Sequence, residues 1–243
     1  MNKNAKNNNY RQSTQKLFFT GSLISGVMLG LNAPGFGTHW LGLISLFPLI
    51  FILEKLHAED ALSFRKRALL FFGICWLAGG IAASIGGYWI TNSTHVFGHL
   101  PWPAALMITA VGYGLEVGFQ LFVYFAIPLL LIPKLNNWDL PLRLAFVLAL
   151  DPWYPRLIHW NYGALTFSEF TWIEQLADII GSSGLLLYSA GFAFLLSGWL
   201  RWKSGKLSHK KILQASFLYL LLWIIGLSYG AWRTQNLETK FTE

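Results

Sequence analysis

Cys75 is the only cysteine of this 243-residue chain, and it lies inside the long apolar run from Ala68 to Ile90. A thiol becomes a good nucleophile when a neighbouring base or positive charge favours the thiolate. The apolar run offers neither group, so we interpret Cys75 as a packing residue and expect no catalytic residue in the chain. A single cysteine also permits no disulfide within the chain.

Two histidines, His95 and His99, are spaced four residues apart, and on a helix this spacing can present both rings to one metal ion. A Phe-Gly pair stands between them and no third ligand is evident, so we expect a loop and no metal site. Ser182 and Ser183 come at a predicted helix start, where serine usually caps or packs. No glycine-rich phosphate fingerprint follows a strand, and we expect no cofactor.

Glu116 is the most unusual polar residue, because it lies thirteen residues beyond Pro103 in a predicted membrane helix. At about 1.5 Å per residue, its carboxyl group is roughly 20 Å deep. A carboxyl group at that depth is costly and should face other helices. Tyr113, Gln120 and Tyr124 share its helical face. Two interpretations stay open: this face lines a path for a lipid or a proton, or it forms hydrogen bonds between helices.

The composition indicates an integral membrane protein. Hydrophobic residues make up 54% of the chain and charged residues 12%, whereas ordinary soluble domains have about 25% charged residues. The net charge of +7 is compatible with nucleic-acid binding, but basic residues stand beside apolar runs, as in Arg65-Lys66-Arg67. Such clusters orient membrane helices, so we expect no nucleic-acid partner.

Seven apolar runs predict an all-α fold, a polytopic membrane bundle of about seven transmembrane helices. Their expected ranges are 17–33, 40–53, 68–90, 104–132, 144–150, 179–200 and 212–232, of which the fifth stops early. Residues 1–16 are rich in Asn, Gln and Lys, and we expect them to form a disordered cytoplasmic tail. The transmembrane domain then covers residues 17–232, and residues 233–243 form a short outer tail.

Basic residues orient this bundle, because cytoplasmic loops are enriched in Lys and Arg. Of the 18 Lys and Arg residues, four lie in the N-terminal tail, four in residues 54–67, two at Lys134 and Arg143, and five in residues 201–211. Arg156, Arg233 and Lys240 fall on the other side. We therefore predict that the N-terminus is cytoplasmic and that the C-terminus lies outside.

Two aromatic stretches, residues 92–103 and 151–178, are expected on the outer side, where Trp and Tyr favour the headgroup level. We predict that they meet and form a cleft for phospholipid headgroups and acyl chains. Arg156 matters most, because a guanidinium group binds phosphate through two parallel hydrogen bonds. In the alternative, the aromatic residues only anchor the bundle and Arg156 pairs with Asp151. The candidate cleft residues are Trp89, His95, His99, Trp102, Arg156, His159 and Trp160.

Several motifs closely resemble the membrane portion of bacterial apolipoprotein N-acyltransferases. The clearest is the order Gly-x-x-Trp-x-x-x-Ser-x-x-x-Phe-Gly-x-Leu-Pro, which runs from Gly86 to Pro101. An earlier stretch, 32–37 followed by Trp40 and a Leu-Phe-Pro-Leu sequence, resembles the start of the same family. Residues 160–188 resemble its fifth-to-sixth helix region, although His159 stands where the family has proline.

The resemblance implies a multi-pass protein of the bacterial inner membrane, with a periplasmic C-terminus and a lateral way in for a phospholipid donor and a lipoprotein acceptor. In that family, acyl transfer depends on a nitrilase-like domain with Glu, Lys and Cys residues, and the chain ends about where that domain would begin. We therefore expect it to bind phospholipid or lipoprotein and to support lipoprotein N-acylation with a separate nitrilase-like catalytic subunit. The alternatives are a non-catalytic lipid- or lipoprotein-binding scaffold and a small transporter that uses Glu116.

Overall fold

A computed structural model describes residues 3–58, 62–132, 139–156 and 161–242, and every regular element in these ranges is helical. The longer helices are α1 (Lys3–Leu31), α3 (Phe47–His57), α4 (Phe64–Gly86), α9 (Asp139–Leu150), α13 (Leu186–Lys203) and α14 (His209–Thr242). The shorter elements are η1 (His39–Leu41), α2 (Gly42–Ser45), α5 (Tyr88–Val96), η4 (Asp151–Trp153), α10 (Tyr162–Phe167), α11 (Thr171–Glu174) and α12 (Ala177–Gly184).

One further helical run is continuous from Trp102 to Leu131. It consists of α6 (Trp102–Ile108), the π-helical η2 (Thr109–Tyr113), α7 (Gly114–Leu121), the π-helical η3 (Phe122–Ala126) and α8 (Ile127–Leu131). A π-helical turn holds an extra residue, so each of these two turns changes the direction in which the following side chains point.

Four helical runs are long and apolar enough to cross a membrane: His39–His57, Phe64–Gly86, Trp102–Leu131 and His209–Leu237. A fifth span results if α12 and α13, which meet at 56°, are counted as one. The apolar part of α1, Lys16–Leu31, is shorter, and α9 has only 12 residues. The predicted helical membrane bundle is therefore confirmed in its class, whereas its count of about seven spans is not.

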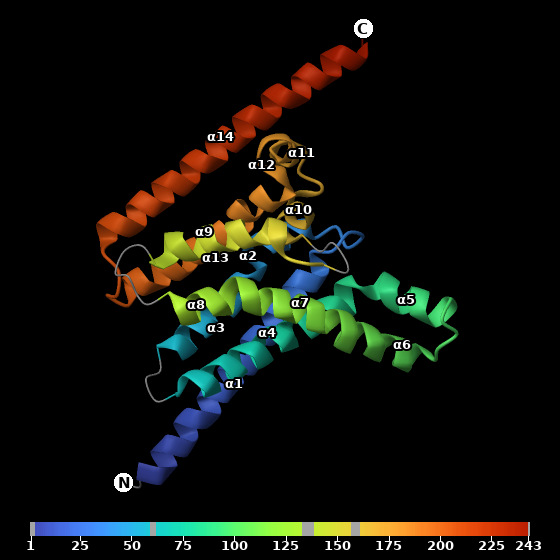
Figure 1. Cartoon of the computed structure of the whole chain (residues 1–243). Helices are drawn as coiled ribbons and strands as arrows, with labels where there is room; N and C mark the ends of the chain where they lie inside the picture. Colours follow the sequence, from blue (N-terminus) through green and yellow to red (C-terminus); the bar gives the residue numbers. More distant parts are fainter. Residues whose placement is uncertain (1–2, 59–61, 133–138, 157–160, 243) are drawn as a thin grey trace.

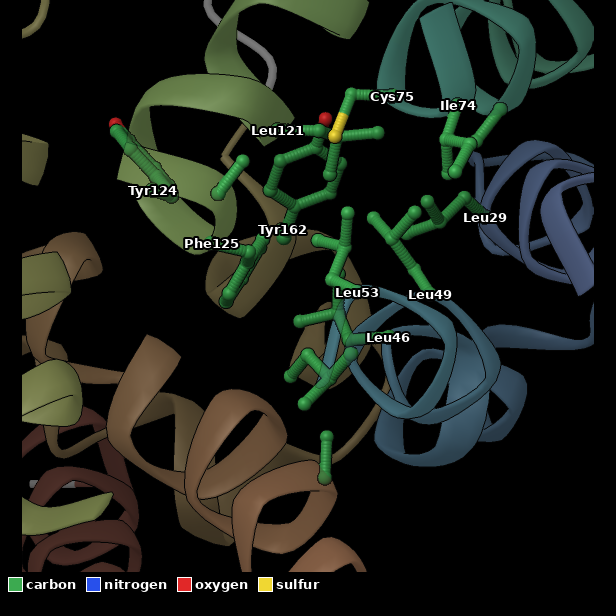
Figure 2. Close-up of a cluster of buried hydrophobic side chains, with 14 of the residues drawn as sticks. Leu29, Leu46, Leu49, Leu53, Ile74, Cys75, Leu121, Tyr124, Phe125 and Tyr162 are labelled. Carbon is green, nitrogen blue, oxygen red and sulfur yellow. The ribbon is translucent and has the colours of Figure 1, made fainter. Parts of the chain in front are cut away.

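The long helices pack in two groups that share one apolar core. Helix α4 packs against α1 and α7, while α13 packs against α2, α3 and α9. Figure 2 shows where the groups meet: Leu29, Leu49 and Leu53 approach Cys75 and Tyr162, which come from other helices. Helix α14 lies outside this core, along one edge of the molecule, and packs on α11 and α13 (Figure 1).

Glycines bring α4 and α7 into backbone contact. A Cβ atom placed on Gly79 would lie 2.3 Å from the backbone nitrogen of Gly118, and one placed on Gly114 would lie 2.6 Å from Cα of Gly80. Because lipid provides no hydrophobic drive between helices, membrane helices associate best where small residues permit such close approach. This crossing fixes the position of the helical run that carries Glu116 and its polar neighbours.

Both predicted outer stretches contain more helix than the sequence suggests. After Gly87 the chain continues as α5 to Val96, because nothing in this uncharged segment stops a helix. In the second stretch, α10 and α11 fold into the bundle, and Phe167 packs edge-on against Tyr188 with 5.8 Å between ring centroids. Backbone groups at membrane depth must be hydrogen-bonded within the protein, and short helices achieve this.

The terminal helices are also longer than predicted. The helical trace of α1 reaches back to Lys3, through residues for which the sequence indicates a disordered tail. Helix α14 continues beyond Trp232 to Thr242. In both segments no proline or glycine interrupts the chain, and residues such as Gln and Lys are good helix formers.

Candidate functional site

A cluster of four polar side chains lies between the run of η2 to η3 and the end of α9. We call Gln120, Tyr124, Asp151 and Arg156 the polar cluster. The Tyr124 hydroxyl donates to Oδ1 of Asp151 at 2.7 Å, and the Gln120 amide donates to the Tyr124 oxygen at 3.1 Å. Gln120, Tyr124 and Asp151 are 2%, 0% and 1% exposed. The sequence predicts that the helix ends at Asp151 and Pro152, and in the structure Asp151 lies at the centre of the polar cluster.

Arg156 joins the cluster through a single nitrogen atom. Its Nη2 forms an ion pair with Oδ1 of Asp151, donates to the Asp151 carbonyl at 3.1 Å and donates to the Tyr124 oxygen at 3.0 Å. Its Nε is buried and has no hydrogen-bond partner. The Asp151 carbonyl follows the last turn of α9, where the helix dipole favours a cation. Arg156 therefore neutralises both the Asp151 carboxylate and the C-terminal end of α9.

Asn161 connects the polar cluster to the surface of the bundle. Its Oδ1 accepts the backbone N–H of Ala164 at 3.0 Å and so caps the start of α10. Its Nδ2 lies 3.4 Å from Oδ2 of Asp151 and 3.3 Å from Oγ of Ser182, which is exposed. A row of polar groups thus runs from an exposed serine to the buried carboxylate.

Aromatic residues and one further carboxyl group surround the cluster. The Tyr154 ring packs edge-on against Tyr124, with 5.4 Å between centroids. Glu116 lies close enough to Tyr113 and Tyr154 to act electrostatically on both hydroxyl groups. Trp153, by contrast, is 84% exposed. The segment after α9 therefore turns one side toward the polar cluster and the other toward the surroundings of the bundle.

Four predicted cleft residues, Trp89, His95, His99 and Trp102, lie on the hairpin formed by α5 and α6. Nδ1 of His95 lies 2.6 Å from the Leu100 carbonyl, a contact within this hairpin. His99 has a left-handed backbone, with φ of 51°. Trp89 and Trp102 are 49% and 53% exposed. Among the residues that the structure describes, no group of three His, Cys, Asp or Glu side chains could hold a metal ion.

The hairpin and Arg156 are well separated. Trp102 and Tyr124 belong to one helical run and are 22 residues apart, about 33 Å along its axis. Since the Arg156 guanidinium lies 3.0 Å from the Tyr124 oxygen, it is at least roughly 20 Å from Trp102. Figure 1 likewise shows α5 and α6 projecting away from α10, α11 and α12. The described residues of the two stretches do not form one cleft, and His159 and Trp160 lie outside the described residues.

A second buried ion pair links α9 and α3. The sequence predicts that Arg143 is one of the basic residues on the cytoplasmic side, but Arg143 lies within α9 and is 2% exposed. Its Nη1 lies 3.2 Å from Oε1 of Glu54, whose other oxygen accepts a hydrogen bond from Ser197. The sequence feature that could have revealed this ion pair is Glu54 at the end of an apolar run, because a carboxylate there is costly in a membrane unless it is paired.

Comparisons with known proteins agree with the resemblance seen in the motifs. The family model described as the apolipoprotein N-acyltransferase N-terminal domain matches residues 25–195, a range that contains the entire polar cluster. A curated apolipoprotein N-acyltransferase of Bdellovibrio bacteriovorus is 28% identical over 241 residues, which cover 92% of this chain and 40% of that protein. The chain thus spans less than half the length of this relative. No solved structure matches the chain.

Proposed function

Because the chain belongs to the apolipoprotein N-acyltransferase family, over the N-terminal domain of that family, we propose that it binds phospholipid or lipoprotein and supports lipoprotein N-acylation in the bacterial inner membrane. The observation that carries this proposal is that the matched residues, 25–195, contain three of the four long apolar helical runs and the buried polar cluster. A polar group inside a membrane bundle is costly, so its presence there supports a role in binding.

The chemistry of acyl transfer is assigned to a separate nitrilase-like catalytic subunit. Covalent acyl transfer needs a nucleophile with a neighbouring base. Cys75 is fully buried in the apolar core, among Leu121, Tyr162 and other large side chains (Figure 2). Such a thiol reaches neither substrate nor base, which supports a binding role for this chain and a catalytic role for its partner.

The proposed topology has seven crossings, with a cytoplasmic N-terminus and a periplasmic C-terminus. Its crossings are α1, α2 with α3, α4, the Trp102–Leu131 run, α9 with the segment after it, α12 with α13, and α14. The ends of α3 and α13 and the start of α14 gather at one side, on the left in Figure 1, and the basic residues cluster at these ends. Arg143 is not counted among these clustered basic residues, because it is buried within α9.

The direct test is to purify the full chain from native membranes in mild detergent and to identify what copurifies. We expect phospholipid together with a protein of nitrilase-like sequence. An unrelated multi-pass inner-membrane protein, prepared in the same way, is the control for adventitious lipid. Retention of neither lipid nor partner above this control contradicts the proposal. Lipid without a catalytic partner supports the alternative, a non-catalytic lipid- or lipoprotein-binding scaffold.

A second candidate is a small transporter that uses Glu116. It is favoured by the row of Tyr113, Glu116, Gln120 and Tyr124, since the π-helical turns in which two of them lie often mark functional sites. On α9, however, the buried apolar residue Val147 lies halfway between Arg143 and Asp151. It interrupts the row of polar side chains that a transport path along this helix would need. Transport predicts a pH-dependent flux into proteoliposomes that Glu116→Gln abolishes, whereas the scaffold predicts no flux.

A further inference from the structure

We propose that Arg156 binds the phosphate group of a membrane phospholipid, and that the Asp151 carboxylate occupies Arg156 when no lipid is bound. This inference rests on the proposed function and deepens it, because it names the lipid group, the side chain that binds it and the side chain that competes with it.

Arg156 has hydrogen-bond donors that its present contacts do not use. A guanidinium group carries five N–H donors and binds an acidic partner best through two nitrogen atoms. Here Nη2 makes the contacts with Asp151 and Tyr124, while Nε is buried with no partner. The Arg156 side chain is only 10% exposed, so its contact with bulk water is limited. A phosphate group, with several acceptor oxygens, can accept from this unused donor when the guanidinium turns away from Asp151.

Asp151 does not depend on Arg156 alone. Its Oδ1 accepts the Tyr124 hydroxyl at 2.7 Å, and its Oδ2 lies 3.4 Å from the Asn161 amide nitrogen. A buried carboxylate that loses its only partner is strongly destabilising. With two further donors in place, Asp151 stays hydrogen-bonded when Arg156 turns toward another anion. Arg156 can therefore exchange one acidic partner for another.

The position of Arg156 favours a lipid over a soluble anion. Arg156 follows Trp153 and Pro155, which are exposed, and it belongs to no helix, so its backbone is free of helical hydrogen bonds. Asn161 leads from the cluster to the exposed Ser182. In a membrane, an apolar bundle surface that displays a Trp side chain faces lipid. A phospholipid can place its phosphate at Arg156 while its glycerol and acyl chains lie along this surface.

The test measures binding of defined lipids to the full chain in detergent. The probes are phosphatidylglycerol, a glycosyl diacylglycerol that lacks phosphate, and inorganic phosphate. Asp151→Asn removes the competing carboxylate, so it should lower the midpoint of thermal unfolding without lipid and bind phosphatidylglycerol roughly tenfold more tightly than the parent, the effect of one charge-assisted hydrogen bond. The double variant Asp151→Asn/Arg156→Gln, which leaves no unpaired charge, should bind both lipids equally.

Two further variants keep the test decisive. Asn161→Asp keeps both Asp151 and Arg156 but replaces the amide that lies 3.4 Å from Oδ2 of Asp151 with a second carboxyl group. The added negative charge should hold Arg156 more firmly, so phosphatidylglycerol should bind more weakly, even if Asp151→Asn fails to fold. Arg233→Gln is the matched control, because it also removes one arginine from an ion pair, with Asp178 at 2.8 Å, but on an exposed surface. It should bind both lipids as the parent does.

The outcomes separate this inference from the proposed function. If the parent retains phospholipid but Asp151→Asn and Asn161→Asp bind it as the parent does, the phosphate site is wrong and lipid binding stands. If inorganic phosphate stabilises Asp151→Asn as much as phosphatidylglycerol does, the ligand is a free anion and the lipid assignment is overturned. If the parent binds neither lipid, the proposed function itself fails.

Discussion

The guanidinium group of Arg143 lies 3.2 Å from Oε1 of Glu54, although 89 residues separate the two in the sequence. The other oxygen of Glu54 accepts a hydrogen bond from Ser197. These side chains come from α9, α3 and α13, so one carboxylate fastens three helices. Both charged side chains are shielded, with exposures of 3% for Arg143 and 15% for Glu54.

Removing either charge alone should destabilise the bundle. Glu54→Gln removes the carboxylate that pairs with the buried Arg143 guanidinium, and we expect a loss of about 3–5 kcal/mol in the free energy of unfolding. The double variant Glu54→Gln/Arg143→Gln should recover most of this loss, because both charges of the ion pair are removed together. Denaturant unfolding in detergent measures both. Lys203→Gln, an exposed change near the same end of α13, should alter stability by less than about 0.5 kcal/mol. Strict additivity of the single losses contradicts the pairing.

The glycine crossing of α4 and α7 should not tolerate a methyl group. A Cβ atom on Gly118 would lie 2.5 Å from Cα of Trp76, so Gly118→Ala must push the two helices apart. We expect a loss of about 1–3 kcal/mol in the free energy of unfolding. Gly112→Ala is the matched control on the same helical run, because its Cβ meets nothing within 4 Å. Equal stability of both variants contradicts the close crossing.

Cys75 should be dispensable for function. Its side chain is fully buried in α4, so Cys75→Ala removes only one small core atom and should cost about 1 kcal/mol while lipid and partner still copurify. The intact thiol should also resist a maleimide reagent until the protein is unfolded. Loss of copurifying lipid and partner from a well-folded Cys75→Ala variant contradicts its assignment to packing, as does rapid labelling of the native protein.

The C-terminus is predicted to be periplasmic. A reporter that is active only in the cytoplasm, fused after Glu243, should give no signal, whereas one that is active only in the periplasm should give a strong signal. The physical reason is the clustering of Lys and Arg at the opposite ends of the helices. The same pair of reporters at the N-terminus should give the reverse pattern. A bright cytoplasmic signal from the C-terminal fusion contradicts an odd number of crossings.

The sequence by itself determined the class of the protein and its family. Apolar runs of sufficient length, with an Asp, Glu, Lys or Arg seldom inside them, have few structural solutions in lipid, because each backbone group must be hydrogen-bonded within the chain. The order of residues from Gly86 to Pro101 indicated the family, and the match over residues 25–195 shows it. The sequence also predicted that Tyr113, Gln120 and Tyr124 share one face, and all three are buried.

Only the tertiary structure decided which polar groups meet. The sequence predicts that the outer stretch with Arg156 meets the one with Trp102, whereas the early end of α9 and the folding of α10 into the bundle place Arg156 at Tyr124, 32 residues away in sequence. Periodicity could not reveal this, because it describes one helix at a time. The contacts of Arg156 and the ion pair of Arg143 with Glu54 depend on how the helices cross. One such crossing is that of Gly79 and Gly118, where two helix backbones touch.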